Sequence, residues 1–248
     1  MKKEIINIIK VGGAVVEDET QLSRLLSDFS SVEGKKVLVH GGGRRATKVA
    51  AQLGIETKMV NGRRITDADM LEVVTMVYGG LVNKNVVAKL QGADVDVIRS
   101  HKRPLKNGID YGFVGDVDKA DGLMLSTLIE AGITPVMAPL THDGQGNILN
   151  TNADTIAAET AKALAPYYDV TLTFCFEKKG VLSNPDDDDS VIPVITRDDF
   201  NRYVADGTIA GGMIPKIENA LDAIQAGVNK VVITKADALG QDSGTVII

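Results

Sequence analysis

Two glycine clusters in this sequence each follow a short, mainly apolar run. Gly12-Gly13 comes directly after residues 5–11, and Gly41-Gly42-Gly43 comes directly after residues 37–40. A glycine loop between a strand and a helix can direct several backbone N–H groups at a phosphoryl group, with the positive end of the helix behind it. A plain turn would explain one such loop. Two loops in similar positions favour phosphoryl-group chemistry.

The stretch from Gly41 to Ala46 has two other interpretations, and the rest of the sequence supports neither. As G-x-G-x-x-A it resembles a dinucleotide-binding fingerprint, but no acidic residue stands about 20 positions further on at a clear strand end. As His-Gly-Gly-Gly it resembles the oxyanion loop of esterases, but the sequence contains no G-x-S-x-G nucleophile elbow. No Walker A motif is present either, because the only Gly-Lys pair, Gly34-Lys35, lacks the other residues of that motif.

Strand and helix patterns alternate along the chain and must position these loops. Further strands are predicted over residues 95–98, 134–137, 170–176 and 230–233. Helices are predicted over residues 22–29, 44–53 and 70–81, the last beginning at the capping-box-like stretch Thr66-Asp67-Ala68-Asp69. This alternation is typical of an α/β fold, a three-layer αβα sandwich with a mostly parallel central sheet. Because ligands bind beyond the carboxyl ends of such strands, we expect the glycine loops at a ligand-binding edge.

The composition excludes several classes of protein. Of the 248 residues, 44% are hydrophobic, 24% charged and 4% aromatic, which is typical of a globular protein and not of a disordered or fibrous one. The net charge of −6 argues against binding to a nucleic-acid backbone, which requires a basic field. The acidic run from Asp186 to Asp189 is interpreted as a solvated loop and not as a metal site.

Cysteine usage and the N-terminal residues indicate a cytoplasmic protein. The single cysteine, Cys175, cannot form an internal disulfide, and the three scattered histidines do not form a zinc site. The N-terminal segment is too short and too charged for a signal peptide. No apolar run approaches the roughly 18 residues that cross a bilayer. We therefore expect neither a nucleic acid nor a membrane among the partners.

Seven short motifs follow one another along the chain. They are Ile9-Lys10-Val11-Gly12-Gly13, Val39-His40-Gly41-Gly42-Gly43, Asn61-Gly62-Arg63-Arg64-Ile65-Thr66, Asn83-Lys84, Tyr111-Gly112-Phe113-Val114-Gly115-Asp116-Val117, Asn150-Thr151-Asn152-Ala153-Asp154 and Gly211-Gly212-Met213-Ile214-Pro215-Lys216. In this order they resemble the amino-acid kinase family over nearly the whole chain. The resemblance implies an ATP-dependent enzyme of arginine biosynthesis that phosphorylates the side-chain carboxylate of N-acetyl-L-glutamate, or of another N-acyl-L-glutamate. It also implies two lobes, residues 1–165 for the acylglutamate and phosphoryl transfer, and residues 166–248 for the nucleotide.

The resemblance implies three catalytic residues. Lys10 would contact the transferring phosphoryl group, Lys216 would reach the phosphates from the nucleotide side, and Asp154 would hold both lysines in place. A glutamate carboxylate has a pKa of about 4.3 and is ionised at neutral pH, so this nucleophile needs no general base. The difficulty is the repulsion between two anions, which cations and backbone dipoles must offset.

Four further residues are candidates for substrate binding. Arg64 is the best candidate to bind the substrate α-carboxylate, because a planar guanidinium can donate two parallel hydrogen bonds. Its neighbour Arg63 is predicted to be a surface charge. By the resemblance, Asn150 would bind the amino-acid substrate through its amide, and Gly42 and Gly43 would donate backbone N–H bonds.

The nucleotide site is also implied by the resemblance. Its predicted residues are Gly12, Gly13, Glu177, Lys178, Gly180, Leu182, Ile209 and Gly211. The cofactors would be ATP and Mg²⁺, with the metal held mainly by the phosphates and no protein ligand assigned. The family usually has a Thr-Asp-Val-type sequence where this chain has Phe176-Glu177-Lys178. Lys178 therefore adds a cation that either meets a phosphate or is solvated.

Three questions about function stay open at this point. The chain could instead be a glutamate, aspartate or nucleotide-monophosphate kinase of the same family, or a catalytically silent ligand-binding regulatory protein. The basic segment 101–106 supports the hypothesis of a larger, anionic acyl group such as succinyl. The family resemblance implies a homodimer, and the helix bearing Met70, Val73, Val74 and Val77 either forms its seam or faces its own core. Because the sequence begins at the first strand, without the N-terminal helix of arginine-inhibited hexameric members, no feedback hexamer is expected.

Overall fold

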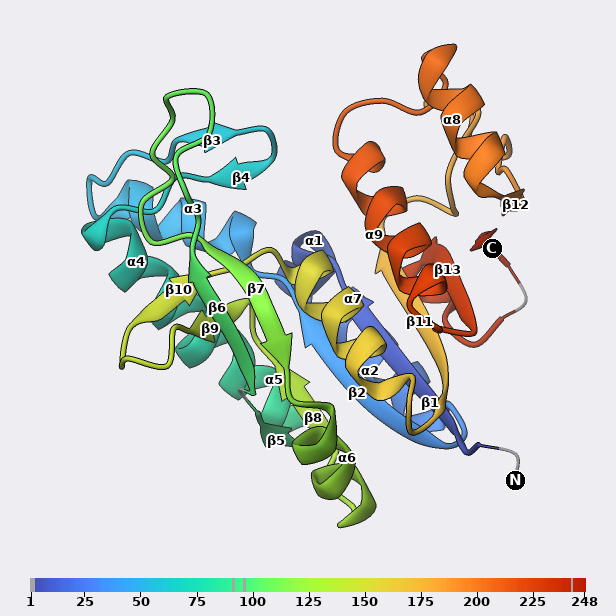
Figure 1. Cartoon of the computed structure of the whole chain (residues 1–248), viewed down its shortest axis with the longest axis horizontal. Helices are drawn as coiled ribbons and strands as arrows, with labels where there is room; N and C mark the ends of the chain where they lie inside the picture. Colours follow the sequence, from blue (N-terminus) through green and yellow to red (C-terminus); the bar gives the residue numbers. More distant parts are fainter. Residues whose placement is uncertain (1–2, 91, 96, 242) are drawn as a thin grey trace.

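The centre of the molecule is an eight-stranded sheet (Figure 1). The computed structural model describes residues 3–90, 92–95, 97–241 and 243–248. The strands lie in the order β12 (Val194–Ile195), β14 (Thr245–Ile247), β13 (Lys230–Lys235), β11 (Asp169–Phe176), β1 (Ile5–Val11), β2 (Lys35–His40), β8 (Pro135–Met137) and β5 (Ala93–Asp94). Neighbouring strands are parallel except for β13 with β14. The predicted mostly parallel sheet is therefore confirmed.

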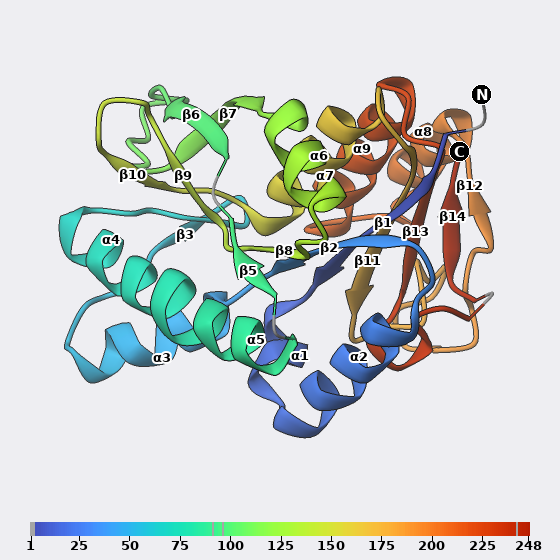
Figure 2. The same cartoon turned by 90° about the horizontal axis from the view of Figure 1, so that it is seen from below.

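Helices cover both faces of this sheet, as Figure 2 shows. One face carries α1 (Gly13–Glu17), α2 (Glu19–Ser31), α3 (Gly43–Gln52), α4 (Ala68–Val74), the π-helix η1 (Thr75–Val82) and α5 (Asn83–Leu90). The other face carries α6 (Gly122–Glu130), α7 (Ala153–Leu164), α8 (Arg197–Ala205) and α9 (Met213–Gln225). A 3₁₀-helix, η2 (Ala236–Ala238), precedes β14. The predicted three-layer αβα arrangement is confirmed.

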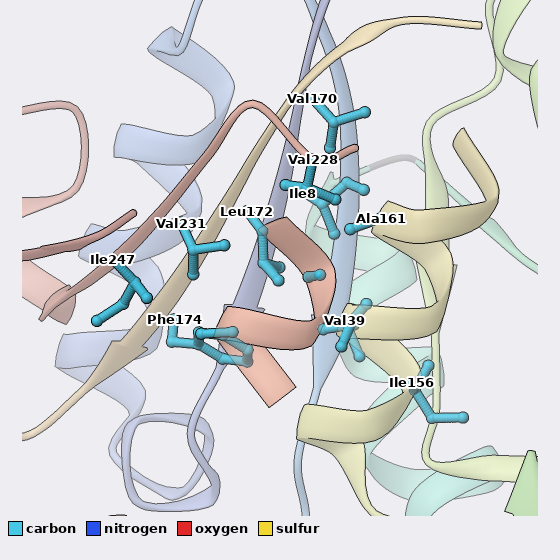
Figure 3. Close-up of a cluster of buried hydrophobic side chains, with 14 of the residues drawn as sticks. Ile8, Val39, Ile156, Ala161, Val170, Leu172, Phe174, Val228, Val231 and Ile247 are labelled. Atoms are coloured by element: carbon cyan, nitrogen blue, oxygen red, sulfur yellow. The ribbon is translucent and has the colours of Figure 1, made fainter. Parts of the chain in front are cut away.

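The central strands bury side chains on both faces, because apolar residues stand at both odd and even positions, as at Ile8 and Ile9 of β1 (Ile5–Val11). Successive side chains of a strand point to opposite faces of the sheet. Ile8 therefore belongs to the same buried cluster as Leu172 of β11 and Ile156 of α7, which Figure 3 shows. Its neighbour Ile9 belongs to a separate cluster with Leu25 of α2. The continuous apolar run that predicted a buried strand fills two cores at once.

A smaller sheet and a short ribbon stand beside the central sheet. The smaller sheet has the order β10 (Ile148–Asn150), β9 (Leu140–His142), β6 (Ile98–Lys102) and β7 (Gly115–Ala120), and the ribbon pairs β3 (Met59–Val60) with β4 (Arg63–Arg64). The loop between β6 and β7 lies against the ribbon (Figure 1), where Thr66 exchanges backbone hydrogen bonds with Tyr111 and Phe113. These two segments thus cover one end of the molecule together.

The strand predicted over residues 95–98 differs from the structure. Strand β5 ends before Val95, and β6 begins only at Ile98; Asp96 lies outside the described residues. Val95 still donates a backbone hydrogen bond to Val136 of β8, at 3.3 Å. The apolar run therefore marks the crossover of the chain from the central sheet to the smaller sheet, and not one strand.

The helix predicted over residues 70–81 has a different start and a change of type. Asp67 caps it, because its carboxylate accepts the Met70 N–H at 2.9 Å, whereas the Thr66 hydroxyl donates to the Arg64 carbonyl. At Thr75 the helix becomes a π-helix. The four apolar residues proposed for a dimer seam, Met70, Val73, Val74 and Val77, are buried within their own chain. This supports the core-facing interpretation, and the homodimer stays a prediction.

The predicted boundary between lobes falls just before β11. That strand pairs in parallel with β1, so the central sheet continues through the boundary. The division into residues 1–165 and 166–248 stays a prediction about which ligand each lobe binds.

Candidate active site

Two lysines from distant parts of the sequence contact one carboxylate. The Lys10 ammonium nitrogen lies 2.6 Å from Oδ1 of Asp154, and the Lys216 ammonium nitrogen lies 2.7 Å from Oδ2. The three side chains are only 10%, 12% and 18% exposed for Lys10, Lys216 and Asp154 respectively. The structure thus brings the three predicted catalytic residues into direct contact.

Each of these residues comes from a different element. Lys10 lies near the carboxyl end of β1, Asp154 in the first turn of α7, and Lys216 in the first turn of α9. Helix α7 begins where it does because the Asn152 side chain accepts hydrogen bonds from the N–H groups of Asp154 and Thr155. This cap fixes the first turn and so directs Asp154 at the end of β1.

Burial and charge have opposite effects on the cluster. Burial raises the pKa of the Asp154 carboxyl, but the two ammonium groups outweigh it and hold that pKa well below its usual range. Burial lowers the pKa of the Lys216 ammonium, and Asp154 opposes that change. The Lys216 nitrogen also lies 5.0 Å from the centre of the Phe174 ring. Because two cations share one anion, the ionised cluster keeps one net positive charge.

The two glycine loops pack against each other beside this cluster. A side chain at Gly41 would place its Cβ only 3.0 Å from the Gly13 nitrogen, and one at Gly13 would lie 3.5 Å and 3.6 Å from the nitrogens of Gly42 and Gly43. In the described part of the chain, the N–H groups of Gly42 and Gly43 have no acceptor. Both are therefore available to a ligand, at the N-terminus of the ten-residue helix α3.

A cavity of about 190 Å³ opens beside these groups. Six residues of the predicted site line it: Lys10, Gly42, Gly43, Arg64, Asn150 and Asp154. Lys216 reaches the cavity wall through Asp154. Lysine, carboxylate, glycine loop and guanidinium therefore meet at the carboxyl ends of β1 and β2, as expected for a parallel sheet.

The Arg64 guanidinium is buried and held by uncharged partners. It donates to the Thr57 hydroxyl at 3.1 Å, and to the Gly43 carbonyl and the Thr47 hydroxyl at 2.9 Å each. Among the described residues, none of its hydrogen bonds reaches a carboxylate. A buried cation without a counter-ion is costly. An anionic ligand in the cavity would remove that cost.

Asn150 is also buried and partly used within the protein. Its amide nitrogen donates to the Thr66 hydroxyl at 2.9 Å, and its backbone N–H donates to the Phe113 carbonyl at 2.8 Å. These two bonds orient the side chain on the cavity wall. The amide oxygen has no donor in the described part of the chain, so it can accept an N–H from a ligand.

The prediction that Arg63 is a surface charge is wrong. Arg63 lines the cavity, and its guanidinium lies 3.4 Å from a carboxylate oxygen of Asp116. Arg103 contacts the same oxygen at 2.6 Å. Burial lowers the pKa of the Arg63 guanidinium, and the Arg103 charge lowers it further. The Arg63 side chain is only 27% exposed, because protein covers much of this side of the ribbon.

A second cavity, of about 270 Å³, lies in the C-terminal part of the chain. Four of the eight residues predicted to bind the nucleotide line it: Lys178, Gly180, Leu182 and Ile209. Gly180 must be glycine there, because a Cβ would lie 2.8 Å from the hydroxyl of Thr245. Gly211 occurs in the turn between two further lining residues, Ala210 and Met213.

The other nucleotide candidates lie apart from this second cavity. Gly12 and Gly13 belong to the glycine loops described above, and the Glu177 carboxylate contacts the Arg44 guanidinium at 2.7 Å. Lys178, although it lines the second cavity, also forms an ion pair with Asp188 at 2.8 Å. The exposed acidic run 186–189 is therefore partly neutralised by a lysine of the same chain. Lys178 thus has an internal partner as well as a place on the cavity wall.

The chain is closely similar to proteins that are already known. A sequence model of the amino acid kinase family matches residues 6–235. The chain belongs to this family. It is 66% identical to the acetylglutamate kinase of Bacteroides thetaiotaomicron, and the similarity covers 98% of each chain.

Solved structures support the amino-acid kinase fold. The smu.665 protein from Streptococcus mutans has a TM-score of 0.79 at 30% identity, covering 98% of both chains. The N-acetylglutamate synthase from Neisseria gonorrhoeae, complexed with coenzyme A and N-acetyl-glutamate, has a TM-score of 0.85 at 22% identity. The match includes 100% of this chain but only 60% of the synthase, so it shows a shared fold.

This amino-acid kinase has cavity residues that sequence reasoning missed. Tyr78 lines the cavity, and its ring lies so close to Gly42 that a Cβ there would be 2.7 Å from Cδ1. Tyr78 belongs to the π-helix, a type of helix often found at functional sites. No signal in the sequence distinguishes it from a core aromatic residue. Asn152 also lines the cavity, and its position inside the Asn150–Asp154 motif could have identified it.

Proposed function

We propose that this amino-acid kinase transfers a phosphoryl group from ATP to the side-chain carboxylate of N-acetyl-L-glutamate. The product would be the acyl phosphate, formed in arginine biosynthesis. The observation that carries the proposal is the contact of Lys10 and Lys216 with Asp154, at the wall of a cavity that also contains Arg64. The acetylglutamate kinase relative, similar over almost the whole chain, supports this choice of substrate.

The lysine cluster meets the main difficulty of the reaction, which is bringing two anions together. Its one net positive charge lies in a buried site, where a charge acts more strongly than in water. Lys10 would contact the transferring phosphoryl group, and Lys216 would contact the phosphates from the nucleotide side. Asp154, ionised at all working pH values because of its lowered pKa, would keep both ammonium groups in place.

The rest of the cavity would bind the acylglutamate. Arg64 would take the α-carboxylate as its missing counter-ion, and Asn150 would bind the substrate through its amide. The free N–H groups of Gly42 and Gly43 would donate to the reacting carboxylate or to the phosphoryl oxygens. Holding both reactants in one orientation supplies a further part of the rate enhancement.

The second cavity would bind the nucleotide. Leu182 and Ile209 are apolar residues suited to the base, and Lys178 would exchange Asp188 for a phosphate. In the described part of the chain, no three His, Cys, Asp or Glu side chains are grouped to hold a metal ion. Mg²⁺ would therefore be bound through the phosphates, where it neutralises charge during transfer.

A coupled assay for ADP formation tests the proposal. The protein is incubated with ATP, Mg²⁺ and one acceptor at a time: N-acetyl-L-glutamate, L-glutamate, L-aspartate or a nucleoside monophosphate. We expect the highest kcat/KM with N-acetyl-L-glutamate. Preference for another acceptor would assign the chain to a different activity within the family. If none of the acceptors supports ADP formation, the result would favour the silent regulatory alternative, which the intact lysine cluster argues against.

A second candidate substrate is an N-acylglutamate with an anionic acyl group such as succinyl. The observation that favours it is the contact of Arg63 and Arg103 with a single carboxylate, Asp116, beside the cavity. Arg63 and Arg103 share the single negative charge of Asp116. One positive charge therefore remains to bind the carboxylate of such an acyl group. Comparing kcat/KM for the N-acetyl and N-succinyl substrates decides between them. A clear preference for acetyl would contradict the succinyl hypothesis.

Location and assembly belong to the same proposal. No helix in the described part of the chain is long and apolar enough to cross a membrane. We propose a cytoplasmic homodimer, in line with the cysteine usage and the family resemblance. Light scattering on the purified protein measures the assembly, and a mass of one chain would contradict a dimer.

A further inference from the structure

His40 is a buried polar residue to which the proposed reaction gives no role. It ends strand β2 directly before the second glycine loop and is fully buried. Its Nδ1 lies 2.9 Å from the carbonyl oxygen of Gly41, and its Nε2 lies 3.2 Å from the amide nitrogen of Asn83. The imidazole thus connects the glycine loop to the first residue of α5.

The neighbours of His40 determine which ring nitrogen carries the proton. The Asn83 amide nitrogen also lies 3.3 Å from the carbonyl oxygen of Val136, which can only accept a hydrogen bond. That atom of Asn83 is therefore the NH₂ group and donates to both neighbours. Because Nε2 of His40 faces a donor, it must be the acceptor, and the imidazole is neutral with its proton on Nδ1. The Nδ1–H then donates to the Gly41 carbonyl.

This hydrogen bond fixes the direction of the next peptide group. In a trans peptide the carbonyl and the following N–H point in opposite directions. Holding the Gly41 carbonyl toward His40 therefore turns the Gly42 N–H away from His40. The Gly42 nitrogen lies on the side of Gly13, on the cavity wall, where the N–H has no acceptor in the described part of the chain.

We propose that His40, as the neutral Nδ1–H tautomer held by Asn83, is a positioning residue that aims the Gly42 N–H at the reacting anion. The inference rests on the proposed function for its kinetic consequence, but the tautomer itself is a property of the free protein. Glycine has no side chain to restrict its backbone, so a loop of three glycines needs such an external support. Asn83 supplies the donor that selects the tautomer.

Nitrogen NMR of the ¹⁵N-histidine-labelled protein tests the tautomer without any assay of activity. Under slightly alkaline conditions, we expect His40 to be protonated on Nδ1 only. His142 is an internal reference, because its Nδ1 accepts the Gly144 N–H at 3.2 Å and its proton must be on Nε2. A proton on Nε2 of His40, alone or together with one on Nδ1, would overturn the proposal.

Two substitutions test the positioning role. In asparagine the amide N–H₂ group is bonded to Cγ, as Nδ1 is in histidine, so it can donate to the Gly41 carbonyl from the same place. In glutamine the amide N–H₂ group lies one bond further from the backbone. We expect His40→Asn to keep a kcat close to wild type, and His40→Gln to lower kcat roughly 10- to 100-fold with little change in either KM. His142→Asn serves as the matched control and should not affect kcat.

The proposal is overturned if His40→Gln keeps the wild-type kcat, or if both His40 variants lose activity equally while remaining folded. Thermal unfolding of each variant checks that the folded state is retained. If neither variant folds, the NMR result on the wild-type protein decides. A wild-type protein inactive on every acylglutamate would refute the proposed function and not the tautomer.

Discussion

Lys10 and Lys216 bind the two different oxygens of the same carboxylate, although one lies on the first strand and the other on the last long helix. Neither lysine contacts a second carboxylate in the described part of the chain. Their ammonium groups would repel each other in the absence of Asp154. The position of both cations therefore depends on this single aspartate.

Replacing either lysine should remove transition-state stabilisation and leave substrate binding largely intact. We expect Lys10→Ala and Lys216→Ala each to lower kcat by roughly 10²- to 10³-fold, with modest changes in KM. Steady-state kinetics measures both constants. Lys162→Ala is the matched control, because this lysine lies on α7 but forms its ion pair with Glu159, away from the cluster. The site assignment is wrong if the two variants behave like the control.

The stability of the protein should depend on pH through Asp154. The pKa of Asp154 in the folded protein lies well below the unfolded value of about 3.9. Its contribution to the free energy of unfolding is therefore fully present above about pH 3.9 and is lost as the pH falls toward the folded pKa. We expect Asp154→Asn to lower the free energy of unfolding by about 3 kcal/mol near pH 7, because two buried cations lose their partner. The difference from wild type should be constant between about pH 5 and 7 and shrink below about pH 4.

Urea unfolding at a series of pH values measures this difference. Asp198→Asn is the matched control, since Asp198 also lies in the first turn of a helix, α8, but is exposed. Asp198→Asn should lower the free energy of unfolding by no more than about 1 kcal/mol at any pH. A difference between wild type and Asp154→Asn that grows as the pH falls would contradict the lowered pKa.

Arg64→Lys should weaken binding of the acylglutamate. A lysine keeps the charge but cannot donate to Thr57, Thr47 and Gly43 and also bind a carboxylate with two parallel bonds. We expect the KM for the acylglutamate to rise roughly tenfold, with the KM for ATP unchanged. Arg197→Lys, at an exposed ion pair, is the control. An equal rise in both KM values would indicate general damage to the fold.

Gly42→Ala should destabilise the protein through one contact. Gly42 has φ −179°, which lies outside the left-handed region that favours glycine. Its Cβ, however, would lie 2.7 Å from the Tyr78 ring. We expect a loss of about 1–3 kcal/mol in the free energy of unfolding, together with a lower kcat. Gly80→Ala meets no atom within 4 Å and should be tolerated, which thermal unfolding of the two variants can compare.

The order of the elements could be predicted from the sequence because it depends on local properties. Residues 5–11 are apolar at almost every position, and this is enough to specify a strand buried on both faces. The glycine loops could be placed at the ligand-binding edge because parallel strands end on the same side. The ordered motifs added the family, which the comparisons confirmed over residues 6–235.

Features that depend on what covers a side chain could not be predicted. Arg63 was expected to be a surface charge, because the sequence does not show that Arg103 and Asp116, from the region of β6 and β7, cover it. Tyr78 has the spacing of a core residue, and only the π-helix brings its ring against Gly42.

The sequence by itself determined which groups are available: two lysines, one aspartate, an arginine candidate for carboxylate binding and two flexible glycine loops. Only the tertiary structure decided how they are shared, with one carboxylate between Lys10 and Lys216 and another between Arg63 and Arg103. The physical reason is that the pairing of charges depends on distances of a few ångströms between residues far apart in the chain. No local pattern encodes those distances.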